Sequence, residues 1–417
     1  MFRAIKFDGF PPFGSDIIEF PPIPEPVGDL AEVHLLTGIN GTGKTRVLAV
    51  LSAFLGNPIP LVKRLQPKQN FTLFINNLLP SENPANSWSR MQVASSANPV
   101  WVHRSEPMKE IVNAPAFAYS GNAYVSDAKI VAMGAIQQPG RDVCLSFDRK
   151  EDSSKDLLQA ITNLKLQAAM DSMDESFEKV PPRRAMNMMT ALEKAVSDIT
   201  GTPFRFNVVS YPEPTIAVIW GSKRLSFGAL PDGLRSIIGS LAHALVLMDV
   251  WLQGKADPAA AKAIFLLDEI ESHLHPAWQR KILPAFQKLF PKAQFFVTTH
   301  SPFVIASLNN GWIHSFKTGN DGTVKVEKPI RASSGDSYLT VVEDIMGIKE
   351  WFDTETESLL TDFRHARDSA YQGDAKAYEQ VRNLAMNIGK RSMELEFMMG
   401  RELIQLERQL AKSSKDQ

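Results

Sequence analysis

One short stretch near the N-terminus limits the folds open to this chain more than any other. Residues 33–36, Val-His-Leu-Leu, form a short run that is apolar apart from the histidine. Residues 38–45 read Gly-Ile-Asn-Gly-Thr-Gly-Lys-Thr, and a second apolar run begins at Val47. A strand, a G-x-x-x-x-G-K-[ST] loop and a helix in this order are typical of a loop that binds phosphate groups. The spacing therefore predicts an α/β fold of the P-loop NTPase type, with this loop at the end of a strand.

The residue types in the loop match the chemistry of a nucleoside triphosphate. Glycine admits backbone angles closed to other residues, so the N–H groups can curl around phosphate oxygens. The N-terminus of the helix that follows adds a partial positive charge. We expect Lys44 to reach the β- and γ-phosphates and Thr45 to place its hydroxyl on Mg²⁺. The candidate nucleotide-binding residues are Gly38, Asn40, Gly41, Thr42, Gly43, Lys44 and Thr45.

Charge and composition limit the binding partners and the cellular compartment that we expect for this chain. The chain has 417 residues, with 45 Lys and Arg against 46 Asp and Glu, so its net charge of −1 gives no global argument for nucleic acid or a membrane surface. Its single cysteine, Cys144, cannot form an internal disulfide and fits a reducing cytoplasm. The sequence shows neither a signal-peptide pattern nor an apolar run of about 18 residues. We therefore expect a cytoplasmic protein that does not bind a membrane.

A second chemical motif follows another apolar run. Residues 263–267 are apolar, and Asp268 and Glu269 come directly after them. Such a run suits a strand buried on both faces of a parallel sheet, and these sheets bind ligands at the carboxyl ends of their strands. We expect Asp268 to hold Mg²⁺ together with Thr45, and Glu269 to polarise the attacking water. These carboxylates and the glycine-rich loop predict a site that hydrolyses a nucleotide.

Three histidines near these carboxylates differ in what they suggest. A further strand pattern, residues 294–299, ends in His300, which is placed to hydrogen-bond a γ-phosphate or the attacking water; a structural histidine is the alternative. His273 and His275 lie near acidic residues and suggest a metal site. We favour no metal there, because residues i and i+2 of a helix do not share a face and no third nitrogen ligand is near.

The remaining helix and strand patterns divide the chain into four predicted parts. Helical spacing covers residues 154–171 and 183–199, and residues 116–120 read as a buried strand. The last helices carry an apolar stripe that could pack on the chain's own core or on another subunit. The predicted parts are the N-terminal part of the ATPase core at 1–56, a largely helical inserted lobe at 57–205, the C-terminal part of the core at 206–330, and a helical tail at 331–417.

Two groups of side chains allow alternatives. Phe10 and Phe13 could stack on a base, but covering the core is the favoured interpretation. Basic residues interleaved with aromatic ones could contact nucleic acid, although a solvated face with a few packed tryptophans suits the neutral charge better. This second group is Lys63, Arg64, Lys68, Trp88, Arg90, Trp101, His103 and Arg104.

The order of these motifs, with the segment Leu-Pro-Asp-Gly-Leu-Arg at residues 230–235, resembles that of the ABC-type ATPases. The sequence Asp-Glu-Ile-Glu-Ser-His-Leu-His-Pro-Ala-Trp-Gln at residues 268–279 is similar to that of a soluble prokaryotic branch. This branch includes OLD-like ATPases and the ATPases of anti-phage systems such as Septu and PARIS. The resemblance implies a mixed central sheet, an inserted helical lobe and a helical C-terminal tail.

The resemblance also implies roles for individual residues. ATP would lie between two subunits of a homodimer or higher homo-oligomer, with His300 as the switch histidine and residues 273–276 joining the two sites. A signature segment of one subunit would contact ATP on the other, through Pro231, Asp232, Gly233 and Arg235.

Two departures from the family pattern stand out. Pro231 occupies the position of the usual signature serine, and residues 225–228 also fit Leu-Ser-x-Gly but read as a strand. The glutamine that usually links the strands to the helical lobe has only Gln137 and Gln138 as candidates.

For function, the resemblance implies an ATP hydrolase, with ATP and Mg²⁺, that controls a separately encoded effector, which we expect to be a nuclease, in anti-phage defence. Residues after His300 carry no Asp-x-Asp metal motif, so a built-in nuclease is not expected. The alternative is a RecF-like clamp that binds DNA during repair or recombination. A basic patch in the dimer cleft would favour the clamp, and an apolar patch on the tail would favour the effector.

Overall fold

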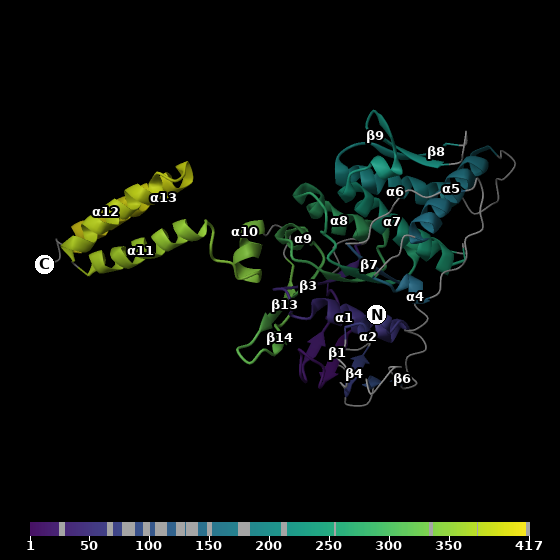
Figure 1. Ribbon diagram of the computed structural model, residues 1–417, viewed down its shortest axis with the longest axis horizontal. Coiled ribbons are helices and arrows are strands. Elements are labelled where there is room, and N and C mark those ends of the chain that lie inside the picture. Colours follow the sequence, from purple (N-terminus) through teal and green to yellow (C-terminus); the bar gives the residue numbers. More distant parts are fainter. Residues whose placement is uncertain are drawn as a thin grey trace. The chain divides into compact units, whose positions relative to one another are not determined.

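The computed structural model describes two compact units, Met1–Val341 and Val342–Gln417 (Figure 1). Within them, the described residues are 1–24, 30–64, 70–76, 88–94, 101–104, 115–121, 130, 141–147, 152–173, 184–209, 215–253, 256–332, 337–372 and 374–413.

A mixed central sheet organises the first unit. Its strands follow the order β14-β13-β3-β12-β11-β7, with β15 also paired to β13. The five strands from β13 to β7 run parallel, whereas β14 and β15 are antiparallel to β13, so the predicted mixed sheet is confirmed. The strands are β3 (Glu32–Gly38), β7 (Ala116–Ser120), β11 (Ile264–Asp268), β12 (Gln294–Thr298), β13 (Gly311–Thr318), β14 (Val324–Val326) and β15 (Ile330–Arg331).

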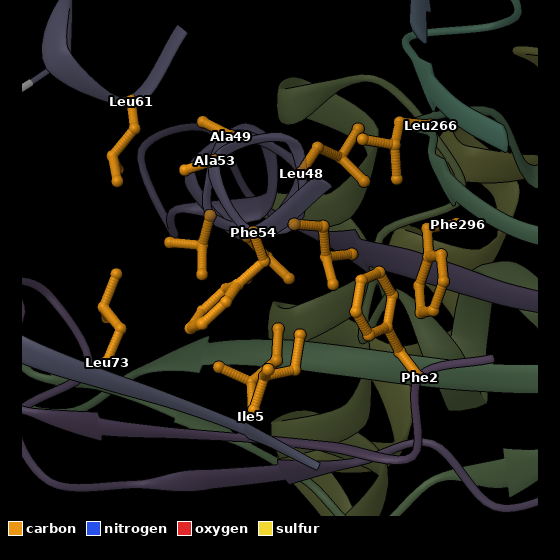
Figure 2. Close-up of a cluster of buried hydrophobic side chains, with 14 of the residues drawn as sticks. Phe2, Ile5, Leu48, Ala49, Ala53, Phe54, Leu61, Leu73, Leu266 and Phe296 are labelled. Carbon is orange, nitrogen blue, oxygen red and sulfur yellow. The ribbon is translucent and has the colours of Figure 1, made fainter. Parts of the chain in front are cut away.

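A second, antiparallel sheet has the order β2-β1-β4-β5-β6. Helix α1 (Lys44–Leu55) joins the two sheets through one core, in which Ile5 and Leu73 of the second sheet and Leu266 and Phe296 of the central sheet surround the helix (Figure 2). The strands are β1 (Ala4–Asp8), β2 (Ile17–Glu19), β4 (Asn70–Asn76), β5 (Ser89–Ala94) and β6 (Trp101–Arg104).

Phe10 and Phe13 belong to this core. Their exposed fractions are 0% and 2%, and the ring of Phe13 stacks on Phe7 with 4.6 Å between ring centroids. The interpretation that these two rings cover the core is therefore confirmed, and neither face is open to a base.

Residues 57–205, predicted as a largely helical lobe, contain the four strands β4 to β7 as well as helices among the described residues. Three of them extend the antiparallel sheet, and β7 joins the central sheet beside β11. In β4 the apolar residues Phe71, Leu73 and Ile75 alternate with less buried ones, which is the period of a strand. Helices in this range are α2 (Ile59–Val62), α4 (Arg141–Cys144), α5 (Asp152–Met173) and α6 (Arg184–Thr200).

A three-stranded antiparallel sheet and a long helix lead back to the central sheet. Its strands are β8 (Phe204–Val209), β9 (Thr215–Trp220) and β10 (Lys223–Ser226), and the helix is α7 (Asp232–Trp251). Among the described helices, α7 alone has the length and composition to cross a membrane, yet 72% of its apolar window is buried inside the structure. Two further helices, α8 (Pro276–Leu289) and α9 (Pro302–Ala306), flank β12 in the sequence.

The second unit is a three-helix tail. Asp353 and Asp374 cap α11 (Thr354–Tyr371) and α12 (Ala375–Gly389) by accepting backbone N–H bonds, and α13 (Met393–Ser413) completes the unit. The predicted apolar stripe supplies Ile388, Leu395 and Leu406 to the tail's own core. The other members of that core are Leu360, Phe363, Ala366, Ala370, Ala377, Val381, Ala385 and Met399.

Candidate nucleotide-binding site

The glycine-rich loop lies between β3 and α1, as the spacing predicts, and two of its glycines have no room for a side chain. A Cβ on Gly38 would be 2.5 Å from the carbonyl oxygen of Phe316, and one on Gly43 would be 2.7 Å from the ring of Phe13. Both also have positive φ angles, 147° and 87°. The buried ring of Phe13 therefore packs against the loop at Gly43.

Lys44 is held inside the loop. Its side chain is 6% exposed, and Nζ donates to the carbonyl oxygens of Gly38 and Ile39, both at 2.9 Å. Burial lowers the pKa of Lys44, while the nearby carboxylates Asp268 and Glu269 oppose that shift. Two loop carbonyls thus hold the ammonium group beside the cavity, where a phosphate could bind to it.

Asp268 joins the loop to the central sheet. Its Oδ1 accepts hydrogen bonds from Thr45 Oγ1 at 2.9 Å and from Thr298 Oγ1 at 2.6 Å. Burial raises the pKa of Asp268, and these two hydrogen bonds oppose the shift. A hydroxyl and a carboxylate at this separation form an oxygen donor set that suits Mg²⁺, which keeps its remaining positions for water and phosphate oxygens. Thr45 and Asp268 therefore fit the ion.

Glu269 begins a tight turn after β11. Its φ angle of 48° is left-handed, which is costly for a residue with a side chain, and its N–H donates to Thr298 Oγ1 at 2.9 Å. A Cβ on Gly121, which directly follows β7, would be 2.0 Å from the carbonyl oxygen of Glu269. Gly121 is thus required by the approach of two chain segments. The sequence pattern gave no reason to single it out.

Glu271 holds the segment that carries His300. Its Oε1 accepts the N–H of His300 at 2.5 Å, and burial raises the pKa of the Glu271 carboxyl. Burial, with Lys44 nearby, lowers the pKa of the His300 ring. No role for Glu271 was predicted from the sequence. An acidic residue three positions after Asp268 was the available signal.

One cavity of about 650 Å³ collects most of these side chains. Glu269, His300 and Lys44 meet there, while Gly38, Thr42 and Asp268 lie behind its lining. Its volume is in the range of small-molecule sites. The lining residues are Pro12, Asn40, Gly41, Gly43, Lys44, Thr45, Arg46, Arg64, Glu269, Thr298 and His300.

Two arginines on this cavity were not predicted as part of the site. Arg46 donates to the carbonyl oxygen of Pro11 at 2.8 Å, and Arg64 donates to that of Pro60 at 2.9 Å. Arg64 had been grouped with basic and aromatic residues of an uncertain surface, of which Lys68 lies outside the described residues. Both guanidinium groups add positive charge where a triphosphate would enter.

The signature residues lie elsewhere. Pro231 precedes the first residue of α7, Asp232, which forms an ion pair with Arg235. A Cβ on Gly233 would be 2.6 Å from the carbonyl oxygen of His273, so this helix end packs on the turn after Glu269. None of these residues lines the cavity of its own chain.

The remaining sequence candidates have separate positions. Residues 225 and 226 belong to β10, as their strand-like pattern predicts, whereas residues 227 and 228 lie in a 3-10 helix. Gln137 and Gln138 lie outside the described residues.

Comparisons with known proteins give short matches. A family profile described as "AAA domain, putative AbiEii toxin, Type IV TA system" matches residues 221–306, which include Asp268, Glu269 and His300. The retron Ec83 probable ATPase of Escherichia coli is 34% identical over 109 residues, covering 26% of this chain and 20% of that protein. Septu protein PtuA of Bacillus thuringiensis is 26% identical over 188 residues, covering 43% of this chain and 46% of that protein.

Each of these two matches spans less than half the length of the curated relative. Among solved structures, the Smc head domain bound to the C-terminal domain of ScpA, from Pyrococcus furiosus, has a TM-score of 0.43 and 15% identity, covering 82% of this chain and 99% of that chain. A likeness at that level adds nothing to the fold described above.

The mixed sheet and the glycine-rich loop between β3 and α1 fit the P-loop NTPase fold predicted from the sequence. The resemblance predicted from residues 268–279 is confirmed: the chain resembles ATPases of prokaryotic anti-phage defence, with Septu and retron proteins among its relatives.

Proposed function

We propose that this chain binds and hydrolyses ATP between two subunits and thereby controls a separately encoded effector, a nuclease, in anti-phage defence. The observation that carries the hydrolytic part is the contact between Thr45 Oγ1 and Asp268 Oδ1, at the edge of a cavity that also holds Lys44, Glu269 and His300. Hydroxyl, carboxylate, ammonium and a second carboxylate are the groups that phosphoryl transfer to water needs in one place.

Each residue then has one task. Lys44 exchanges its bonds to the loop carbonyls for the β- and γ-phosphate oxygens. Thr45 and Asp268 would hold Mg²⁺, which would supply positive charge beside the phosphates. Glu269, the residue that follows Asp268 at the end of β11, lines the cavity and orients the attacking water through its carboxylate. His300 contacts the γ-phosphate side of the cavity. Its position depends on the hydrogen bond from its N–H to Glu271.

The second subunit closes the site. The N-terminus of α7 does not line the cavity of its own chain, and Pro231 and Asp232 are exposed there, so this helix end can meet a neighbouring copy. Gly233 is buried behind it, and Arg235 pairs with Asp232 of its own chain. Pro231 has no hydroxyl, so the contact with the γ-phosphate would come from N–H groups at the start of α7. The packing of Gly233 on His273 links this signature to the turn after Glu269. Closure of one nucleotide site of the dimer would therefore change the position of the turn that belongs to the other site.

Two substitutions test the ATP site. Lys44→Ala should abolish binding of ATP, measured with a fluorescent analogue, because the cavity loses its buried cation. Glu269→Gln should keep ATP binding and lower turnover about 100-fold or more, as expected for loss of a general base. Turnover by Glu269→Gln at the wild-type rate would show that another group orients the water.

Effector control rests on the likeness to the Septu and retron proteins and needs its own experiment. The chain is expressed with the genes that flank its own, as wild type and as Glu269→Gln, and the complexes are weighed by native mass spectrometry. A complex with a nuclease-like neighbour whose composition changes with ATP supports the proposal. A chain that stays alone and binds DNA in an ATP-dependent, salt-sensitive way would instead establish the repair clamp.

A further inference from the structure

One face of α13 is apolar and points away from the tail's own core. Met393, Phe397 and Ile404 are 86%, 72% and 52% exposed. At 3.6 residues per turn, these positions lie on the side of the helix opposite to Leu395 and Leu406, which are buried in the tail. Gly400 lies in the same row, and a Cβ there would meet nothing within 4 Å. We call Met393, Phe397, Gly400 and Ile404 the outer face.

The spacing of the outer face is that of a helix-pairing seam. Its members are separated by four, three and four residues, which is the alternation found where two helices pack along their length. Single exposed apolar residues are common on protein surfaces, but a continuous row marks an interaction site. Because α13 already packs on its own unit through the other side, the row is free to bind something else.

We propose that the outer face binds the same face of a second copy of this chain, with the two α13 helices antiparallel. In this register Phe397 of each copy lies over Gly400 of the other, and Met393 lies opposite Ile404. A large ring then fills the space above a residue without a side chain. A parallel pair would instead place Phe397 on Phe397 and leave a gap between the two glycines.

The charges beside the outer face agree with this register. Glu394 and Arg401 are seven residues apart and therefore lie on the same flank of α13. Reversal of the second helix brings Glu394 of each copy to Arg401 of the other, which gives two ion pairs. With Glu394, Glu396 and Arg401 beside it, the apolar row has surroundings of mixed charge, which suit a second copy better than nucleic acid or an anionic membrane.

This contact is independent of ATP and is tested without it. Full-length protein carrying Lys44→Ala, which removes the proposed nucleotide interface, is studied by sedimentation velocity over a range of micromolar concentrations. We expect reversible dimers in the absence of nucleotide. Phe397→Asp should weaken association at least about tenfold, as for residues at the centre of an interface. Gln380→Asp, an exposed change on α12, should leave association unchanged.

Exchange of the two charges decides the register. Glu394→Arg and Arg401→Glu should each weaken the dimer, and the double variant should restore it. Failure of the double variant to recover would overturn the antiparallel arrangement. A nucleotide-free protein that is monomeric at all concentrations, or one whose dimer is unaffected by Phe397→Asp, would overturn the proposal, whatever the outcome of the ATPase measurements.

Discussion

Gly121→Ala tests whether β7 positions the proposed catalytic carboxylate. The added Cβ would be 2.0 Å from the carbonyl oxygen of Glu269 and 2.9 Å from Cβ of Ser272, while real Cβ atoms essentially never come within 3.0 Å of a neighbour. The Glu269 turn must therefore move by roughly 1 Å, the difference between 3.0 and 2.0 Å. A misplacement of that size at an active site costs about 100-fold in rate, or about 2.7 kcal/mol in barrier.

The assay separates this effect from loss of the site. Single-turnover hydrolysis by Gly121→Ala should fall about 100-fold, whereas ATP affinity should change little, because the loop and Lys44 follow β3 and not β7. Overpacking should also lower the free energy of unfolding by about 1–3 kcal/mol. Gly319→Ala is the matched control, since its nearest neighbour is the end of the Asp321 side chain. Wild-type turnover by Gly121→Ala would refute the argument that this close approach sets the position of Glu269.

Two further predictions concern buried polar groups. Glu271→Ala should lower turnover about tenfold, because the backbone N–H of His300 then loses its acceptor. Glu271→Gln keeps an acceptor oxygen and should recover most of the rate. Equal rates for the two variants would show that this hydrogen bond does not matter for turnover. Burial lowers the pKa of His34 and of His314 in the folded chain. Below about pH 6.5 the unfolded chain therefore binds more protons than the folded chain, and the free energy of unfolding, measured by denaturant titration, should decrease as the pH falls below that value. His314→Phe should reduce this dependence and the exposed His365→Gln should not; an unchanged slope in His314→Phe would contradict the assignment.

The parts of the site that could be predicted from sequence are those in which chemistry restricts the residue type locally. A glycine-rich loop with Lys44 and Thr45 has few other uses, and an apolar strand that ends in Asp268 and Glu269 is equally restrictive. Because β3 and β11 run parallel in one sheet with β12 between them, their carboxyl ends lie at the same edge. The roles assigned to these residues stay proposals.

The parts that could not be predicted depend on approaches between distant segments. Strand β4 pairs with β1, more than sixty residues earlier, and its alternating pattern is too short to outweigh the polar residues around it. Gly121 resembles any glycine in a turn until β7 is placed beside β11. Arg64 follows a short helix and carries no motif, so its place on the cavity appears only when that helix packs beside α1.

Together the two proposed interfaces limit how the chain assembles. Each is isologous, because it pairs a surface with its own copy about a two-fold axis. Two different two-fold interfaces join the same two copies where their axes coincide, and they build larger assemblies where the axes differ. The tail contact would keep two ATPase units at high effective concentration between turnovers. Hydrolysis could then open the nucleotide interface without dispersing the subunits, which would let an effector respond to the state of ATP within a lasting assembly.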